Sequence, residues 1–174
     1  MAGAVFFDRD GVLNDVVLRD GRFVSPRALD QLNVVSDAGV VADRLRRAGL
    51  RIFAVTNQPD IARGQLGEDV LAAMMRSVST AVGLDDYRVC PHDDADGCAC
   101  RKPRPGMITE LAEVWRIELA RSFVVGDSDR DVGAGAAAGC TTVLLRRPYN
   151  ERVEADIVVD TLENAAAAIL ECAR

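Results

Sequence analysis

Short apolar runs alternate with longer segments of helical periodicity along the chain. The apolar runs have strand length and lack the polar alternation of a half-exposed sheet, which is typical of parallel strands buried on both faces. They predict strands over 4–7, 52–55, 87–89, 122–125, 142–145 and 157–159. Apolar residues at helical spacing, together with polar start signals and glycine stop signals, predict helices over 36–49, 67–82, 105–115 and 132–138, and from 162 onward.

The order of these elements predicts the fold class. Strands that alternate with helices imply an α/β protein with a doubly wound parallel sheet. Residues 11–33 have mixed polarity, with a glycine at 11 and an Asp-Gly pair at 20–21, and are expected to form a loop or a hairpin. The 174 residues contain no internal repeat and no linker, so we expect one domain over 1–174.

Polar side chains follow three of the predicted strands directly. Asp8 follows the first strand, Thr56 the second, and Asp127 the strand that ends near residue 126. Ligands of open α/β sheets bind beyond the carboxyl ends of the strands. We therefore expect these three side chains to meet in one crevice, which is the first functional signal in the sequence.

Composition and charge exclude several classes of protein. The chain is 49% hydrophobic and 28% charged, which is ordinary for a globular protein and excludes disorder. Its formal net charge of -6, without a cluster of basic residues, argues against a nucleic-acid partner. No apolar stretch approaches the roughly 20 residues of a membrane span, and Asp8 interrupts the N-terminal apolar run too early for a secretory signal. We expect a cytoplasmic protein without a membrane partner, and a monomer.

Acidic pairs and a single lysine are the candidate catalytic groups. Asp8 and Asp10 stand two residues apart where the first strand ends, as a nucleophile and an acid–base group for phosphorus chemistry would, although the pair also fits a solvated turn. Lys102 is the only lysine, and its point charge suits phosphate, while the common alternative is a surface residue. Asp127, Asp129 and Asp131 follow a later strand and suit Mg²⁺ binding, while the alternative is that an Asp or Ser of this segment, such as Asp129, caps a helix.

A second constellation lies between the third strand and Lys102. Three thiols and the only imidazole of the chain fall within 11 positions, at Cys90, His92, Cys98 and Cys100. This is a complete tetrahedral ligand set for zinc, and a closed four-ligand site is structural rather than catalytic. The alternative is a flexible loop with reduced thiols. Cys140 and Cys172 lie outside the pattern and are expected to be small packed side chains.

The ordered set Asp-x-Asp-Gly, Thr, Lys and Gly-Asp-x-x-x-Asp resembles the haloacid dehalogenase (HAD) superfamily of phosphohydrolases. The resemblance implies a HAD-type, Rossmann-like sheet in which Asp8 is the nucleophile that forms an aspartyl-phosphate. It makes Asp10 the general acid and base, and it assigns Thr56 and Lys102 to the transferring phosphoryl group. It also implies a Mg²⁺ ion held by the carboxylates of Asp8 and Asp127 and by the backbone carbonyl of Asp10.

With the cysteine cluster included, the chain resembles the small zinc-containing HAD phosphatases more narrowly. That group includes heptose 1,7-bisphosphate 7-phosphatases and histidinol phosphatases, and segments 61–64 and 102–107 are more similar to the heptose enzymes. The resemblance implies a capless, Mg²⁺-dependent phosphatase with structural zinc that removes the 7-phosphate of D-glycero-D-manno-heptose 1,7-bisphosphate. It implies substrate contacts from Asn57, Gln58, Arg63, Arg101, Asp20 and Arg22.

Three alternatives remain at this point. The substrate could be histidinol phosphate or another small sugar phosphate. The chain could instead be a zinc-ribbon binding module, or a HAD scaffold that only binds partners. Neither binding role needs the carboxylates of Asp8, Asp10 and Asp127 or the ammonium of Lys102, so the intact set favours an enzyme.

Overall fold

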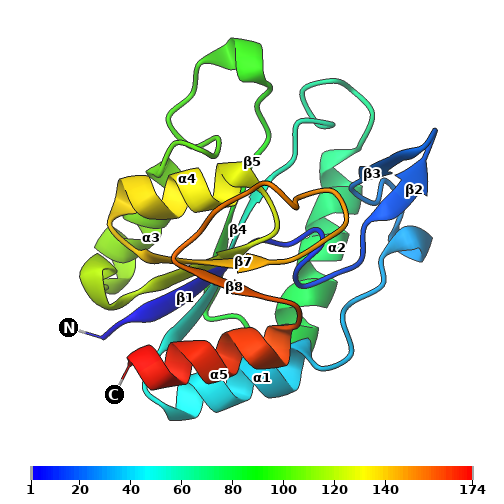
Figure 1. Cartoon of the computed structure of the whole chain (residues 1–174). Helices are drawn as coiled ribbons and strands as arrows, with labels where there is room; N and C mark the ends of the chain where they lie inside the picture. The colour runs from blue at the N-terminus through cyan, green and yellow to red at the C-terminus, as the bar shows by residue number, and fades with distance from the viewer. Residues whose placement is uncertain (1, 174) are drawn as a thin grey trace.

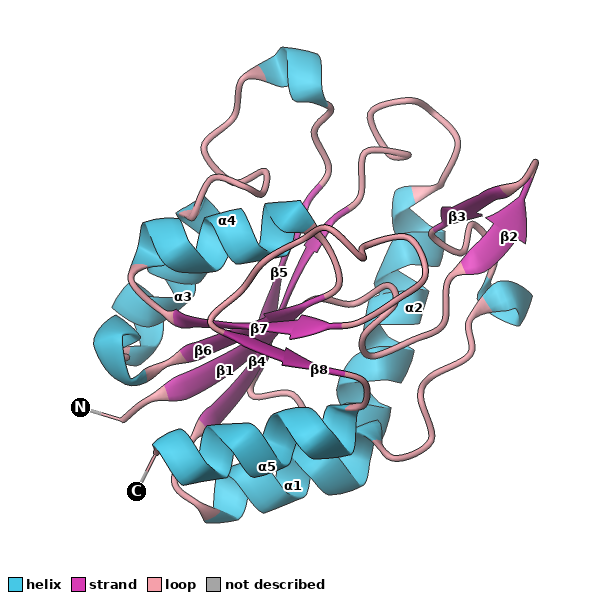
Figure 2. Cartoon of the chain, in the orientation of Figure 1, coloured by secondary structure: helices cyan, strands magenta, loops and turns pink. Residues whose placement is uncertain are grey.

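A six-stranded sheet forms the centre of the computed structural model, which describes residues 2–173. Every pairing in it is parallel, and the strand order is β5-β4-β1-β6-β7-β8 (Figures 1 and 2). The strands are β1 (Ala4–Phe7), β4 (Arg51–Asn57), β5 (Asp86–Cys90), β6 (Phe123–Gly126), β7 (Thr141–Leu145) and β8 (Ile157–Val159). The doubly wound parallel sheet expected from the sequence is confirmed.

Helices cover both faces of the sheet (Figure 2). One face carries α1 (Ala38–Arg47), α2 (Glu68–Val82) and α5 (Leu162–Cys172), and the other carries α3 (Gly106–Trp115) and α4 (Asp129–Ala138). Successive side chains of a strand point to opposite faces, so Phe6 packs in the core under α3 and α4 while Phe7 packs in the core under α1 and α5. This two-sided burial is why β1 is apolar at every position.

A small hairpin fills much of the connection between β1 and α1. Its strands β2 (Val17–Arg19) and β3 (Arg22–Val24) are antiparallel, and Asp20 adopts a left-handed φ of 51° in the turn. The hairpin stands out from the body of the molecule (Figure 1). The loop or hairpin expected over 11–33 is therefore a hairpin. Three single-turn 3₁₀ helices complete the fold: η1 (Leu29–Gln31), η2 (Asp94–Asp96) and η3 (Leu119–Arg121).

Two expectations from the sequence need correction. Helix α4 begins at Asp129 rather than at residue 132, because Ser128 caps it and Asp131 closes a reciprocal capping box. Cys172 is exposed rather than packed, because it lies in the final turn of α5, beyond Ile169, the last buried residue of that helix. Cys140 is buried as expected.

The carboxyl ends of three neighbouring strands meet at one edge of the sheet. Strand β1 lies between β4 and β6. The pairing of β1 with β6 continues one residue past the end of β1, through a hydrogen bond of 2.8 Å from the Asp8 N–H to the Val125 carbonyl. Asp8, Thr56 and Asp127 are consequently brought together, as the sequence predicted. Within residues 2–173, no helix is both long and apolar enough to cross a lipid bilayer. The single domain, the monomeric state, the cytoplasmic location and the lack of a nucleic-acid partner remain predictions.

Candidate active site and zinc-ligand cluster

The Lys102 ammonium lies at the centre of the strand-end site. Its Nζ is 2.6 Å from Oδ1 of Asp8 and 2.5 Å from Oδ1 of Asp131, and it donates a third hydrogen bond of 2.9 Å to the Val55 carbonyl. All three ammonium protons therefore have acceptors, although the side chain is only 3% exposed. The surface-lysine alternative is wrong, because the side chain is buried. A buried ammonium is stable only when it is paired, and the carboxylates of Asp8 and Asp131 supply that pairing.

Burial and mutual repulsion set the pKa values of these carboxylates. Burial raises the pKa of Asp8 well above its usual range; Lys102 lowers it in part, and the Asp131 carboxylate raises it again. Burial raises the pKa of Asp127 to about 6, with a further contribution from Asp131. Burial would lower the pKa of Lys102, but the carboxylates of Asp131 and Asp8 raise it above its ordinary value. The lysine is therefore a permanent cation within an acidic cluster.

Three carboxylates around one ammonium leave surplus negative charge. Oxygens of Asp8, Asp127 and Asp131 all lie within 4.8 Å of one another. Such an oxygen-rich, buried and repulsive group fits Mg²⁺, a hard cation that prefers one or two carboxylates and neutralises their charge. Asp131 is already held by Lys102 and by the hydroxyl of Ser128 at 2.5 Å, so Asp8 and Asp127 are the better-placed carboxylate ligands.

Asp10 points its carboxylate into a separate network of donors. Arg9, which is completely buried, donates to both carboxylate oxygens at 3.0 Å. The other donors are the side chains of Asn14, Ser25 and Gln58, at 3.0, 2.9 and 2.8 Å. These contacts fix the rotamer of the carboxylate beside the cavity that Asp8 lines. The second carboxylate of the Asp-x-Asp pair is thus held by a hydrogen-bond network and does not belong to a solvated turn.

The segment after β4 connects these two networks. Gln58 donates from its amide both to Asp10 and to the hydroxyl of Thr56, at 2.8 Å each. Asn57 donates to the Lys102 carbonyl and accepts from the Lys102 N–H, both at 3.1 Å. The substrate contacts expected from Asn57 and Gln58 stay a prediction; in the structure their amides hold the catalytic candidates in place, and of the two only Asn57 lines the cavity above them.

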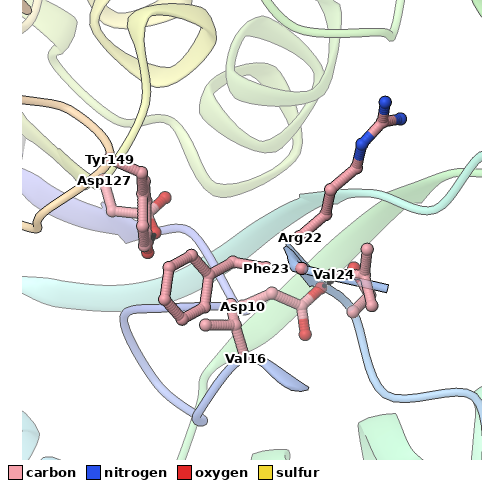
Figure 3. A pocket seen from close by; sticks show the side chains of 9 residues that line it. Asp10, Val16, Arg22, Phe23, Val24, Asp127 and Tyr149 are labelled. Atoms are coloured by element: carbon pink, nitrogen blue, oxygen red, sulfur yellow. Dashed lines mark hydrogen bonds between the residues drawn. The ribbon is translucent and has the colours of Figure 1, made fainter. Parts of the chain in front are cut away.

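An open cavity of about 350 Å³ lies above these groups. It is lined by Asp8, Asp10, Phe23, Ser25, Thr56, Asn57, Pro59, Arg101, Lys102, Ser128, Arg130 and Asp131. A neighbouring cavity of about 570 Å³ opens between the hairpin and Tyr149, and Figure 3 shows side chains that line it. Both cavities are lined by Asp10, Phe23 and Ser25, so they adjoin at these residues.

The predicted substrate-contact residues divide into two groups. Arg101 is buried at the edge of the smaller cavity, and Arg22 lines the larger one, although its guanidinium points away from Asp127 (Figure 3). Arg63 does not line either cavity, because its guanidinium is paired with both oxygens of Asp93 at 2.6 and 2.8 Å. Asp20 lies in the hairpin turn, also outside both linings.

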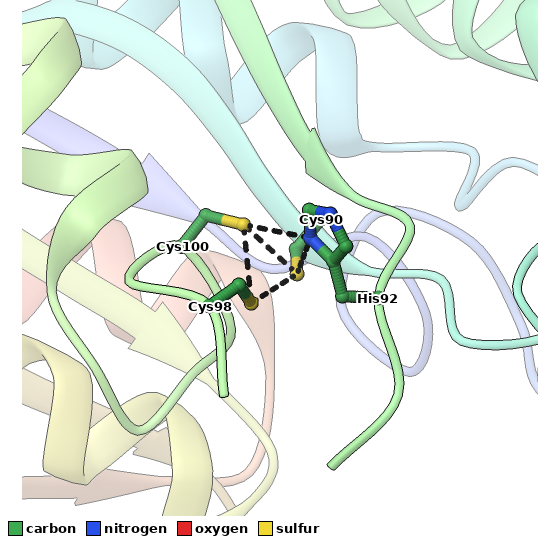
Figure 4. A group of neighbouring side chains, drawn as sticks. All are labelled: Cys90, His92, Cys98 and Cys100. Carbon is green, nitrogen blue, oxygen red and sulfur yellow. Dashed lines mark hydrogen bonds between the residues drawn. The ribbon is translucent and has the colours of Figure 1, made fainter. Parts of the chain in front are cut away.

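The four predicted zinc ligands lie together, Cys90 at the end of β5 and the other three in the loop between β5 and α3 (Figure 4). The sulfur–sulfur distances are 3.1, 3.5 and 3.6 Å, and the Nδ1 of His92 lies 3.3 Å and 3.6 Å from two of the sulfurs. A tetrahedral zinc with bonds of about 2.3 Å to sulfur places its ligands about 3.8 Å apart. The cluster Cys90, His92, Cys98 and Cys100 therefore fits zinc after a slight expansion.

The zinc-ligand cluster is joined to the cavity by the residue that follows it. Arg101 donates to the His92 carbonyl at 3.1 Å and to the Asp94 carboxylate at 2.7 Å, so its side chain is fixed within the same loop. Arg130 of α4 also pairs with Asp94, at 3.3 Å. Asp94 of this loop thereby holds two arginines, Arg101 of the loop and Arg130 of α4, at the rim of the active-site cavity.

Several side-chain contacts within the site are not predicted by the sequence. Asp131 is a sequence candidate for Mg²⁺ binding or helix capping, and its contact with Lys102 is seen only in the structure. Arg9 and Ser25 hold Asp10. Tyr149 donates a hydrogen bond to Asp127. For Asp131 the motif itself was a signal, whereas the other contacts depend on tertiary structure.

Comparisons with known proteins agree with this geometry. A family model described as HAD-hydrolase-like matches residues 99–165. A D-glycero-beta-D-manno-heptose-1,7-bisphosphate 7-phosphatase from Rhodopseudomonas palustris is 39% identical over 148 residues, which span 78% of this chain and 79% of that protein. The protein of the same name from Pseudomonas aeruginosa is 33% identical over 180 residues, 96% of this chain and 97% of that one.

A solved structure extends the agreement to three dimensions. The crystal structure of D,D-heptose 1.7-bisphosphate phosphatase from B. bronchiseptica, complexed with magnesium and phosphate, matches with a TM-score of 0.83 at 31% identity, over 97% of this chain and 98% of that one. The fold and the site thus define a phosphatase of the HAD type, as the sequence resemblance predicted. Within that class, the chain belongs to the D-glycero-beta-D-manno-heptose-1,7-bisphosphate 7-phosphatase family.

Proposed function

We propose that this chain removes the 7-phosphate of D-glycero-D-manno-heptose 1,7-bisphosphate by way of an aspartyl-phosphate on Asp8. The observation that carries the chemistry is the contact between Asp8 and the buried ammonium of Lys102 beside an open cavity. The cation attracts a phosphate dianion to a position next to the Asp8 carboxylate. The names and the high coverage of the relatives support the choice of sugar.

In the first half of the reaction, an oxygen of Asp8 attacks phosphorus. The bond between phosphorus and the C7 oxygen of the sugar breaks, and the Asp10 carboxyl gives its proton to that oxygen. Lys102 and the hydroxyl of Thr56 hold the phosphoryl oxygens while charge moves across them. Phosphoryl transfer requires mainly such positioning and charge neutralisation.

In the second half, the Asp10 carboxylate takes a proton from water, and the water oxygen attacks the phosphorus of the aspartyl-phosphate. The bond to Asp8 breaks, so the enzyme regains its carboxylate and releases inorganic phosphate. One residue thus serves as acid and then as base, which restores the starting protonation state. The donors around Asp10 keep its carboxylate at the edge of the cavity during both steps.

Asp8, Asp127 and the backbone carbonyl of Asp10 would hold Mg²⁺, which neutralises charge on the phosphoryl oxygens when it is bound. The cluster Cys90, His92, Cys98 and Cys100 would hold a structural zinc, which fixes the loop that carries Arg101. Arg101 and Arg130 at the rim offer cationic contacts to the part of the substrate remote from the reacting phosphate.

The proposal is tested with a panel of phosphate esters under identical conditions with Mg²⁺. The panel contains both anomers of the heptose bisphosphate, histidinol phosphate and several common hexose and pentose phosphates, and phosphate release gives kcat/KM for each. We expect a heptose bisphosphate to exceed every other compound by at least about tenfold. A higher kcat/KM for histidinol phosphate would replace the proposed substrate and leave the catalytic site unchanged.

A further inference from the structure

The loop between β7 and β8 holds the backbone around Asp127. The amide of Asn150 donates to the Asp127 carbonyl at 2.7 Å and to the Leu145 carbonyl at 2.8 Å. Arg147 donates to the Gly11 carbonyl at 3.0 Å, which fastens the same loop to the segment that carries Asp8 and Asp10. This loop is therefore anchored at both of the strand ends that carry the candidate Mg²⁺ ligands.

Tyr149, between these two anchors, contacts the Asp127 carboxylate itself. Its hydroxyl donates a hydrogen bond to Oδ2 of Asp127, and within residues 2–173 no other side chain donates to that carboxylate. Gly11 makes this approach sterically feasible, because a Cβ there would collide with the Asp127 carboxylate and lie 2.9 Å from the Tyr149 hydroxyl. The contact thus depends on a close packing of three residues from three separate segments.

The ring of Tyr149 forms part of the larger cavity. It packs against Phe23 of the hairpin, with ring centroids 5.0 Å apart and planes inclined at 43° (Figure 3). Tyr149 is 42% exposed, so its ring is open to the cavity while its hydroxyl is directed at an Asp127 that is only 6% exposed. One side chain therefore joins the wall of the cavity to a candidate metal ligand.

We propose that Tyr149 is a positioning residue that orients the Asp127 carboxylate for a divalent cation. The hydroxyl is hydrogen-bonded to Oδ2, which restricts rotation of the carboxylate and leaves Oδ1 without a side-chain donor among residues 2–173. Groups that hydrogen-bond to a metal ligand fix its orientation, and their loss commonly weakens metal binding about 10–100-fold. This inference rests on the Mg²⁺ site of the proposed function but assigns a role outside the Asp-x-Asp, Thr, Lys and Gly-Asp motifs.

The test measures Mg²⁺ binding by titration calorimetry, in the absence of substrate, for the wild type and for Tyr149→Phe. We expect the dissociation constant to rise about tenfold, because phenylalanine keeps the ring against Phe23 and removes only the hydroxyl. Tyr87→Phe is the matched control, since Tyr87 is the only other tyrosine and lines a separate cavity beside α2 and β5. Its Mg²⁺ affinity should equal that of the wild type.

A kinetic measurement separates positioning from a general structural effect. For Tyr149→Phe, the Mg²⁺ concentration that gives half-maximal phosphatase activity should rise about tenfold, whereas kcat at saturating Mg²⁺ should stay within about twofold of the wild type. Tyr149→Trp, which keeps an aromatic ring but cannot place a hydroxyl on Asp127, should show the same rise. Unchanged or tighter Mg²⁺ binding by Tyr149→Phe overturns the inference. A wild-type protein that binds no Mg²⁺ contradicts the proposed metal site itself.

Discussion

The side chain of Asn57 hydrogen-bonds both backbone groups of Lys102, the N–H and the carbonyl, at 3.1 Å each. The two residues are 45 positions apart, and this reciprocal contact fixes the loop that brings the ammonium of the only lysine to Asp8. Asn57 therefore acts on the reaction through Lys102, in addition to lining the cavity.

Asn57→Ala should lower kcat about 10–100-fold, because a displacement of Lys102 of about 1 Å removes much of its catalytic value. Lys102→Ala should lower kcat further, and the double variant should be no worse than Lys102→Ala alone. Non-additive loss is the signature of two residues that act as a unit. Strictly additive losses would mean that Asn57 contacts substrate independently of Lys102.

Asp8→Asn should abolish turnover while the fold is retained, since an amide cannot form the acyl phosphate. Asp10→Asn should keep Mg²⁺ affinity, because the proposed contact is its backbone carbonyl, and should lose activity by about 10²–10⁴-fold. Steady-state phosphate release and Mg²⁺ calorimetry on the two variants check both statements. Near-normal activity of Asp8→Asn would contradict the nucleophile assignment.

The zinc-ligand cluster should contain about one zinc per chain by elemental analysis. Cys98→Ser should loosen the loop that holds Arg101 while the sheet remains folded. We expect kcat/KM to fall more for a heptose bisphosphate than for a small generic phosphate ester, because only the sugar uses remote contacts. Cys140→Ser, in a buried thiol outside the cluster, is the control. An equal fall of kcat/KM for both substrates would mean that the zinc contributes only to stability and not to substrate selection.

Asp86 should make stability depend on pH in the acid range. Burial would raise its pKa, but hydrogen bonds from Trp115 and Tyr87 and the pairing with Arg88 lower the pKa below its ordinary value. Because the folded pKa is lowered, the stabilisation is present above about pH 4 and is lost as the pH falls through the folded pKa. Asp86→Asn should cost about 1 kcal/mol at pH 7 and progressively less as the pH is lowered through the acid range, as measured by urea unfolding.

Asp43→Asn is the control for that comparison, because the Asp43 carboxylate lies in exposed ion pairs with Arg46 and Arg47 on α1. Pairs of this kind contribute little to stability. Its difference from the wild type should be smaller than that of Asp86→Asn at pH 7. A constant penalty for Asp86→Asn at every pH would mean that its charge is not involved.

Much of the fold could be predicted because its signals are local. The buried parallel strand β1 and the stretch 52–55 of β4 are apolar at every position, so Phe6 and Phe7 both indicate core although they face opposite layers. The start of α4 was placed late because the capping box of Ser128 and Asp131 lies in a segment that the sequence assigned to chemistry. The exposure of Cys172 depends on where the burial of α5 ends, which no local pattern indicates.

The residues of the site likewise form two groups, those with a local signal in the sequence and those whose contacts depend on the folded chain. Asp8, Thr56, Lys102 and the zinc-ligand cluster were predictable because each follows a strand end or has an unusual composition. The contacts of Arg9, Ser25 and Tyr149 join distant segments, so they could only be found in the folded chain. Arg63 was expected at the substrate, but its pairing with Asp93 places it outside the cavity linings. Long charged side chains take partners that sequence does not specify.

The position of the phosphate that is lost tests the central claim most directly. ³¹P NMR of D-glycero-D-manno-heptose 1,7-bisphosphate incubated with the enzyme and Mg²⁺ resolves the C1 and C7 phosphates and inorganic phosphate. We predict that the C7 signal disappears, that inorganic phosphate appears in equal amount, and that the C1 signal is retained. Loss of the C1 phosphate, or no hydrolysis of either position by a folded, Mg²⁺-loaded protein, would contradict the proposed function.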